Sequence, residues 1–329
     1  MLILNAEEVR KTLPMKATIE AMKKAYASLS DGKAEVPLRT RVSVPSQDAL
    51  GIFMPAYVQT DEDEALAIKV VSIFPNNPAR GMPYIQAAVI AFDAKSGSVA
   101  ALLEGGTLTA IRTGAGSGAA IDLLARKDSK VVAIFGAGVQ GRTQLEAASA
   151  VRGIEKAWVF DSDPARAEAF VKDMAGKGTL PSDLRVASSS KEAVQDADII
   201  CTATTSTSPV FADSDLKPGV HISAIGAYTP EMVEVPAETV CRAKVFVDSR
   251  SAVLAEAGDL IQPIQKGLIT EAHVLAELGE IVLGRKAGRQ NDSDVTFFKS
   301  VGVAVQDAIS AQLALKNAKE QGLGQNIPF

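Results

Sequence analysis

The sequence has few of the side chains that bind metals or form disulfides. Its 329 residues include two cysteines, Cys201 and Cys241, and two histidines, His221 and His273. A metal site rich in histidine is therefore not expected. Each cysteine lies in or beside an apolar run, so we expect buried free thiols rather than a disulfide.

Long apolar runs and an excess of positive charge are also absent. No apolar run approaches the roughly 20 residues that a membrane-spanning helix needs. The first residues, Met1–Asn5, lack the basic segment and the long apolar core of a secretion signal. The formal net charge of -5 argues against nucleic acid or an anionic membrane as the main partner. We therefore expect a cytoplasmic protein with no nucleic-acid partner and no membrane partner.

The composition is that of a globular chain long enough for two domains, with 47% apolar and 22% charged residues. Up to about residue 35 the apolar spacing is helical, and Asn5 with Glu8 predicts a helix cap and its reciprocal partner. Strands are then expected at residues 41–44, 66–74, 85–92 and 99–103. Short turns between them predict an antiparallel or mixed sheet, and hence an α+β domain.

From Val131 onward, apolar strands alternate with helical segments. The strands are expected at residues 131–135, 157–161, 184–187, 199–202, 221–225 and 245–247, with helices at 164–177 and 191–195 among them. This alternation predicts a doubly wound parallel sheet of the α/β class. A helix of small residues is expected at 109–126, and a C-terminal helix at 301–319. The C-terminal helix could pack back on the first domain and make that domain discontinuous.

The most informative motif is a glycine fingerprint directly after the strand at 131–135. Gly136, Gly138 and Gly141 stand in G-x-G-x-x-G spacing and open a helix. The first glycine allows a tight turn, the second allows a pyrophosphate to approach, and the third allows close packing of helix and strand. The helix start, with Val139 and Gln140, then offers N–H groups to the phosphates. The motif predicts a dinucleotide site, and a purely structural glycine turn is the alternative.

Residues that follow other strands are expected to complete this site, because ligands bind at the carboxyl ends of parallel strands. They are Thr202, Ala203 and Thr204 after one strand, and Ile225 and Gly226 after the next. Asp161 ends a strand twenty residues beyond Gly141, where a carboxylate accepts hydrogen bonds from the ribose hydroxyls of NAD. Arg166 follows it and could accommodate NADP, so NAD is predicted and NADP stays possible.

Basic residues outside the fingerprint form a candidate anion site. Lys69 lies among apolar neighbours on a predicted strand, where a lysine is unfavourable unless it is paired. Arg112 opens the helix of small residues, and Arg41 lies on the first predicted strand. These three could bind a small carboxylic acid, since arginine binds carboxylates bidentately. Arg39 competes with Arg41 for this role, and an edge-strand lysine that reaches water is the alternative for Lys69.

The chain resembles the ornithine cyclodeaminase/mu-crystallin family over essentially its whole length. The matching pieces are Arg41, Met54–Ala56, Lys69, Asn77–Pro83, Thr109–Ala115, Gly136–Gly141, Gly226 and Ser300–Gly302. The resemblance implies a Rossmann domain and a substrate and dimerisation domain in a homodimer. It also implies that NAD or NADP is bound and that the substrate is an amino acid or its cyclic imine. We expect the first domain at 1-113 plus 300-329 and the Rossmann domain at 114-299.

The resemblance also assigns roles to individual residues. Arg41, Lys69 and Arg112 match the family's ligands for the substrate carboxylate, and Lys69 is placed near the reacting nitrogen. Ser300, Val301 and Gly302 fall where members of the family approach the nicotinamide.

One departure bears on the reaction. Cyclodeaminases of the family carry an aspartate two residues after Gly226, where this chain has Tyr228. The segments Phe298–Gly302 and Leu254–Asp259 look more like the mu-crystallin and ketimine reductase branch. We therefore expect an NAD(P)H-dependent reductase of cyclic imino acids such as 1-pyrroline-2-carboxylate. The alternatives are an ornithine cyclodeaminase, an alanine dehydrogenase-like enzyme, and a dinucleotide-binding protein without catalytic activity.

Overall fold

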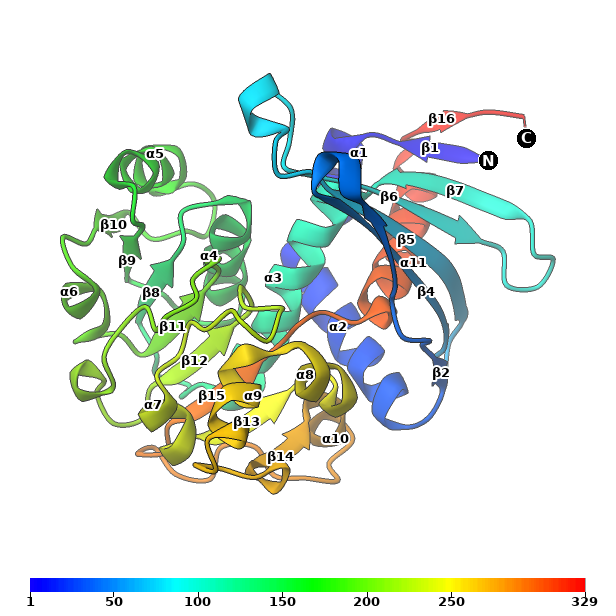
Figure 1. The fold of residues 1–329 in the computed structure, drawn as a ribbon. Coiled ribbons are helices and arrows are strands. Elements are labelled where there is room, and N and C mark those ends of the chain that lie inside the picture. Colours follow the sequence, from blue (N-terminus) through cyan, green and yellow to red (C-terminus); the bar gives the residue numbers. More distant parts are fainter. Residues whose placement is uncertain (329) are drawn as a thin grey trace. The chain divides into compact units, whose positions relative to one another are not determined.

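The computed structural model describes residues 1–328, and these form two compact units (Figure 1). The first unit comprises Met1–Arg112 and the C-terminal segment from Val303 onward, and the second comprises Thr113–Gly302. The domain limits expected from the sequence stay a prediction.

The first unit contains a mixed sheet, as expected. Its strands run in the order β16-β1-β7-β6-β5-β4-β2, and β3 pairs with β4 beside β2. The pair β1–β7 is parallel and the other pairs are antiparallel. The strands are β1 (Leu2–Leu4), β2 (Ala34–Glu35), β3 (Thr40–Val44), β4 (Ala49–Gln59), β5 (Glu64–Ile73), β6 (Ile85–Phe92), β7 (Val99–Glu104) and β16 (Gln325–Asn326).

The predicted N-terminal helix is in fact a strand followed by two helices, α1 (Ala6–Thr12) and α2 (Met15–Ser30). The break falls at Leu13–Pro14 because proline lacks an N–H and disfavours the helical conformation of the residue before it. The cap predicted from Asn5 and Glu8 is confirmed, since each side chain accepts a hydrogen bond from the other residue's backbone N–H.

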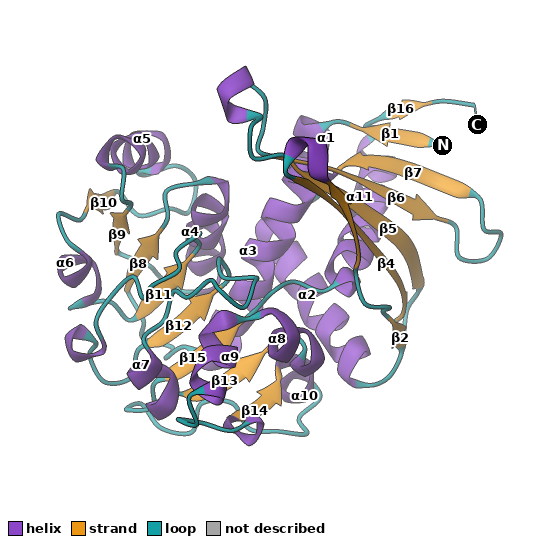
Figure 2. Cartoon of the chain, viewed as in Figure 1, coloured by secondary structure: helices purple, strands orange, loops and turns teal. Residues whose placement is uncertain are grey.

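The C-terminal helix α11 (Ala304–Gln321) packs against α2 and against β4, β5 and β6. Figure 2 shows α2 and α11 together on the same face of the sheet. This face carries the buried side chains of β5, because burial alternates along that strand and Ala67, Lys69 and Val71 are buried. The C-terminal helix therefore covers the strand that bears Lys69.

The prediction from sequence missed β4, which is central in the sheet. β4 contains Pro55, and proline argues against a central strand because it cannot donate to a ladder. The structure tolerates it because β3 pairs with Ala49–Phe53 and β2 pairs with Tyr57–Val58. Pro55 falls in the gap between these two partners and is opposite Ile68 of β5 on the other side.

The second unit contains a wholly parallel sheet, which confirms the predicted α/β class. Its strand order is β10-β9-β8-β11-β12-β15-β13-β14, so the direction of winding reverses between β8 and β11. The strands are β8 (Val131–Phe135), β9 (Lys156–Phe160), β10 (Asp183–Val186), β11 (Ile199–Thr202), β12 (His221–Ala224), β13 (Lys244–Val247), β14 (Val274–Glu277) and β15 (Thr296–Lys299). A ligand crevice is expected where the winding reverses.

Helices connect these strands. They are α4 (Val139–Val151), α5 (Pro164–Met174), α6 (Ser190–Val194), α7 (Ala237–Arg242), α8 (Arg250–Glu256), α9 (Gly258–Gln265) and α10 (Leu278–Val282). The helix of small residues, α3, covers Gly105–Leu124 and so begins earlier than expected. Within the described residues, no helix has the length and apolar character to cross a membrane.

One glycine of α3 allows this helix to approach α4 closely. A Cβ atom on Gly114 would lie 2.6 Å from the carbonyl oxygen of Thr143 and 2.8 Å from its Cβ atom. Real Cβ atoms do not approach backbone this closely, so any side chain at this position forces the helices apart. The small residue at position 114 therefore serves close packing between α3 and α4.

We predict that Gly114→Ala lowers the free energy of unfolding by about 1–3 kcal/mol, which is the usual cost of overpacking. Gly153→Ala is the matched control, because nothing lies within 4 Å of a Cβ at that position. Urea denaturation followed by circular dichroism measures both. Equal stability of the two variants would contradict the packing role of Gly114.

Candidate functional site

The glycine turn between β8 and α4 has the geometry that the fingerprint predicts. Gly136 has a φ of +96°, and a Cβ on it would lie 2.6 Å from the carbonyl oxygen of Ala203. A Cβ on Gly141 would overlap the carbonyl oxygen of Gly136. Around Gly138 the space is more open, since the nearest atom to its Cβ position is Nη2 of Arg166 at 3.4 Å. Each glycine therefore meets a different steric requirement.

The start of α4 is suited to bind an anion. Gly138 is its N-cap residue and no side chain caps the first turn. The N–H groups of Val139 and Gln140 stand at this uncapped end, where the helix dipole is positive. Val139 is 65% exposed, which leaves the end of the helix accessible.

Asp161 follows β9 and holds the glycine turn directly. Its Oδ2 accepts a hydrogen bond from the N–H of Ala137 at 2.7 Å, and its Oδ1 accepts one from Asp163 at 3.0 Å. The carboxylate is half-buried and borders the pocket described next. It is therefore placed both to shape the turn and to meet a ligand.

A pocket of about 340 Å³ lies at the carboxyl ends of β8, β9 and β11. It opens where the winding of the sheet reverses, as expected for a nucleotide crevice. Of the predicted cofactor residues, those that line it are Gly136, Gly138, Asp161, Ala203 and Thr204. The remaining predicted cofactor residues do not line it: Val139, Gln140, Gly141, Thr202, Ile225, Gly226, Ser300, Val301 and Gly302.

A buried acid that the sequence prediction missed holds two of the loops at this edge of the sheet. Glu234 is fully buried, and its Oε1 accepts hydrogen bonds from N–H and Oγ1 of Thr204 at 2.7 and 2.8 Å. Its Oε2 accepts from the N–H groups of Gly226 and Ala227 at 2.8 and 3.0 Å. Burial raises the pKa of Glu234, while these donors and the Lys299 cation favour its charged form.

A second missed acid organises the segment after β15. Oδ2 of Asp248 accepts hydrogen bonds from Oγ of Ser300 at 2.6 Å, from N–H of Val301 at 3.1 Å and from N–H of Gly302 at 2.8 Å. Gly302 has a φ of +78°, which favours glycine at this turn. The predicted residues Ser300–Gly302 thus form one turn around a buried carboxylate.

The first unit contains a buried cluster of opposite charges. Nζ of Lys69 on β5 lies 3.0 and 2.9 Å from the two carboxylate oxygens of Asp307 on α11. Nε of Arg112 on α3 lies 2.9 Å from Oδ1 of the same carboxylate. The side chains of Lys69 and Asp307 are 1% exposed and that of Arg112 is 6% exposed. Two of the three predicted anion-binding residues are therefore brought together around one acid.

Polar neighbours extend this cluster. Oε1 of Gln306 accepts hydrogen bonds from Nη1 of Arg112 at 2.9 Å and from N–H of Val303 at 3.0 Å. Nε2 of Gln306 donates to the hydroxyl of Tyr26 on α2 at 2.8 Å. Buried polar groups with these partners have fixed positions. Arg112 lies within α3 and does not open it, because the helix already begins at Gly105.

The surroundings change the proton affinity of Lys69. Burial and the Arg112 cation lower the pKa of Lys69 to about 7, while Asp307 acts in the opposite direction. Arg39 also lowers it. The protonated and neutral forms of Lys69 are therefore close in free energy near neutral pH.

The third predicted anion-binding residue is Arg41. It is exposed on β3 and lies opposite Ile52 of β4, whereas Lys69 lies opposite Met54. Residues that are opposite each other on neighbouring strands share a face of the sheet. Arg41 is therefore on the same face as Lys69, in the row of Ile52 and Val71, next to the row of Met54 and Lys69. Arg39, which competes with Arg41 for the predicted role, is among the cations that lower the pKa of Lys69.

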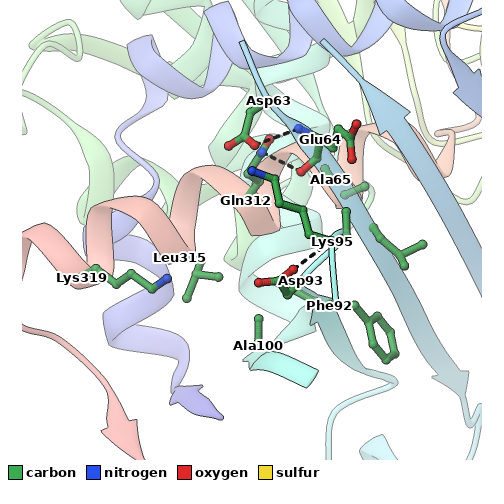
Figure 3. Close-up of a pocket in the computed structure, with 14 residues that line it drawn as sticks. Asp63, Glu64, Ala65, Phe92, Asp93, Lys95, Ala100, Gln312, Leu315 and Lys319 are labelled. Carbon is green, nitrogen blue, oxygen red and sulfur yellow. Dashed lines mark hydrogen bonds between the residues drawn. The ribbon is translucent and has the colours of Figure 1, made fainter. Parts of the chain in front are cut away.

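A further hollow of about 270 Å³ lies in the first unit, between the β6–β7 turn and α11 (Figure 3). Charged residues such as Asp93, Lys95 and Lys319 border it. Gln312 also borders it, and its Nε2 donates to the Glu64 carbonyl at 2.9 Å. None of the predicted site residues lines it.

The two units thus define a class of protein: a Rossmann-type dinucleotide-binding unit in one chain with an α+β unit that carries a buried Lys–Asp–Arg cluster. The model of the ornithine cyclodeaminase/mu-crystallin family matches residues 1–322. The chain belongs to this family.

Three similar proteins are informative. A Delta(1)-pyrroline-2-carboxylate reductase of Bacillus cereus (strain ATCC 10987 / NRS 248) is 40% identical over 330 residues, which covers 100% of both chains. The ketimine reductase mu-crystallin of Mus musculus is 36% identical over 314 residues, 94% of this chain and 95% of its own. The structure of Thermococcus litoralis Delta(1)-pyrroline-2-carboxylate reductase, in complex with NADH and L-proline, has a TM-score of 0.94. It is 44% identical, and the match covers 99% of this chain and 100% of that one.

We predict that Asp307→Asn lowers the free energy of unfolding by about 3–5 kcal/mol, because it leaves the buried Arg112 cation without its anion and removes the partner of protonated Lys69. Glu7→Gln breaks the exposed Glu7–Lys11 pair of the same unit and serves as the control. That loss is expected to be below about 1 kcal/mol. Urea denaturation measures both, and a small effect at Asp307 would contradict the importance of its ion pairs.

Proposed function

We propose that this protein is an NAD(P)H-dependent reductase of cyclic imino acids, of the 1-pyrroline-2-carboxylate or ketimine type. The observation that carries the proposal is the buried cluster of Lys69, Arg112 and Asp307 in a chain that also has a complete dinucleotide turn. The reductases of Bacillus cereus and Thermococcus litoralis, which this chain resembles over their whole lengths, support it.

The charges in the cluster suit an anionic substrate. When Lys69 is protonated, two cations share the single carboxylate of Asp307, and one positive charge is not balanced within the cluster. A substrate carboxylate supplies the missing negative charge, and arginine binds such a group with directional hydrogen bonds. We propose that Lys69 and Arg112 bind the carboxylate of the imino acid, and that Arg41 contributes from β3.

Lys69 also fits the proton requirement of imine reduction. A protonated imine accepts hydride more readily than a neutral one, and the reaction adds one hydride to carbon and one proton to nitrogen. When bound, the reduced nicotinamide supplies the hydride. A lysine with a pKa of about 7 can hold the proton at the imine nitrogen and give it up at neutral pH. We assign this role to Lys69, with Asp307 as the residue that positions its amine.

The residues at the nucleotide pocket fit NAD. Gly138 leaves room for a pyrophosphate at the start of α4, and Gly136 makes the tight turn before it. Asp161 borders the pocket as an acceptor for ribose hydroxyls. Its negative charge disfavours a 2′-phosphate, so NADH is the preferred donor. Arg166 borders the same pocket and could interact with that phosphate, which keeps NADPH possible.

Other assignments rest on family membership. Ser300, Val301 and Gly302 are proposed to approach the nicotinamide, with Thr202, Ile225 and Gly226 at the neighbouring strand ends. A homodimer is proposed as the assembly. Tyr228 follows β12 where cyclodeaminases carry an aspartate, so net reduction is favoured over ornithine cyclisation.

We predict that the purified protein oxidises one NADH for each 1-pyrroline-2-carboxylate reduced. We also expect kcat/KM to be higher for NADH than for NADPH. Nicotinamide absorbance and product proline measure the stoichiometry. Ornithine, and pyruvate with ammonia, are tested in the same assay. Release of ammonia from ornithine without a net absorbance change would instead identify a cyclodeaminase. Saturable nucleotide binding without turnover on any of these compounds would identify a non-catalytic binder.

We predict that Lys69→Ala lowers kcat/KM for the imine by about 100-fold or more, as expected when a positioned proton donor is lost. Lys95→Ala, an exposed lysine of the same unit, is the control and keeps wild-type activity.

The pH profile tests the same assignment independently. The reduction needs protonated Lys69, so wild-type kcat/KM falls as the pH rises through about 7, and the residual activity of Lys69→Ala lacks this limb. Near-normal turnover by Lys69→Ala, or an unchanged profile, would remove Lys69 from the chemistry.

A further inference from the structure

A buried ionic network lies beneath the edge of the parallel sheet that carries the nucleotide pocket. It consists of Glu234, Asp259 and Lys299, each at most 1% exposed. Oδ1 of Asp259 accepts hydrogen bonds from the N–H groups of Glu234 and Val235 at 2.7 and 2.9 Å. Oδ2 of Asp259 lies 2.8 Å from Nζ of Lys299, the last residue of β15. The network therefore joins the loop of Glu234 to β15 and α9.

The backbone N–H of Glu234 binds Asp259, whereas its side-chain carboxylate binds the segments that follow β11 and β12. The carboxylate accepts four hydrogen bonds, two on each oxygen. The donors are Thr204, Gly226 and Ala227. A carboxylate that accepts on every side has no proton to donate, so this arrangement requires the ionised form. The backbone of Glu234 is held as well, because the N–H of Val210 donates a hydrogen bond to the Glu234 carbonyl at 2.9 Å.

Two glycines show how closely the loop after β11 is held. A Cβ on Gly226 would meet the backbone of Thr204 and would lie 2.5 Å from Oε1 of Glu234. A Cβ on Gly136 would lie 2.6 Å from the carbonyl oxygen of Ala203. The Ala203–Thr204 segment is thus enclosed between the fingerprint turn on one side and Gly226 with Glu234 on the other. Both of its residues line the nucleotide pocket.

We propose that Glu234 is a positioning residue for the nucleotide: its carboxylate fixes the Ala203–Thr204 wall of the pocket against the fingerprint glycine, and the Asp259–Lys299 pair holds Glu234 in place. Glu234 acts through the backbone it binds and does not itself line the pocket. The inference rests on the proposed nucleotide site and is independent of the imine chemistry.

The test is Glu234→Gln in the full chain. The amide keeps the shape of the side chain, but its NH2 group replaces an oxygen that accepts two hydrogen bonds. The NH2 group then faces two donors and cannot accept from either. We expect the Kd for NADH to rise at least tenfold, measured by the fluorescence of bound NADH. The KM for NADH rises in parallel, while kcat at saturating NADH stays within about threefold of the wild type.

Asp198→Asn is the matched control. Asp198 is a buried carboxylate of the same unit that also accepts from four donors: the N–H groups of Lys130 and Val131, and the side chains of Arg126 and Lys217. It precedes β11 and binds the start of β8, at the opposite ends of the strands from the pocket. We expect this variant to lose stability while its Kd for NADH stays within twofold of the wild type.

The outcomes separate the hypotheses. A Kd for NADH within twofold of wild type in Glu234→Gln would overturn the inference. Equal losses of affinity in both variants would also overturn it, because Glu234 would then be merely structural. If Glu234→Gln does not fold, Asp259→Asn decides: a threefold or greater rise in Kd supports the positioning role, and no change refutes it. Failure of the wild type to bind NADH or NADPH would instead refute the proposed function.

Discussion

The carboxylate of Asp307 is the interaction on which the candidate catalytic cluster depends. It lies between Lys69 and Arg112, which come from a strand and a helix distant in the sequence. Two buried cations this close would repel each other strongly in a medium of low dielectric constant. One shared acid makes their proximity tolerable, yet it does not neutralise both. The cluster therefore carries an unbalanced positive charge whenever Lys69 is protonated.

Buried carboxylates play a comparable part in the second unit. Glu234, Asp248 and Asp259 each accept backbone N–H groups from segments that follow strands. Loops at strand ends have few backbone partners of their own, and an acidic side chain supplies acceptors for several N–H groups at once. Several of the residues predicted to touch the cofactor are among the partners of these acids, namely Thr204, Gly226 and Ser300–Gly302.

Much of the fold could be predicted because its signals are local. The alternation of strands and helices after Val131, the glycine spacing and the Asn5–Glu8 cap are each contained in short stretches. The prediction failed where a local rule conflicted with tertiary structure. Pro55 concealed a central strand, because nothing nearby in the sequence reveals a gap between two partner strands. β14 and β15 were also missed, although each has four residues, as do the predicted strands β11 and β12.

The basic residues of the candidate site could be predicted from the sequence, but the acids that bind them or hold the loops could not. Lys69 and Arg112 were identified because basic residues in apolar or small-residue surroundings are unusual. Their partner Asp307 was not, because an aspartate near the start of a helix is common and its contact with Lys69 spans 238 positions. Glu234 was missed for a different reason: it lies in a loop without a motif, and its partners Thr204, Gly226 and Ala227 become neighbours only when the strand ends meet. Membership of the family accounts for roles that neither pattern nor geometry supplies.

The low proton affinity of Lys69 has a thermodynamic consequence for ligand binding. Near pH 7 only part of the protein carries a proton on this amine, because its pKa is about 7. A bound carboxylate stabilises the ammonium form, so association with an anionic ligand draws a proton from the solvent. The heat of binding then includes the ionisation of the buffer and differs between buffers. Substrate recognition and proton loading would be a single coupled equilibrium, completed before any hydride moves.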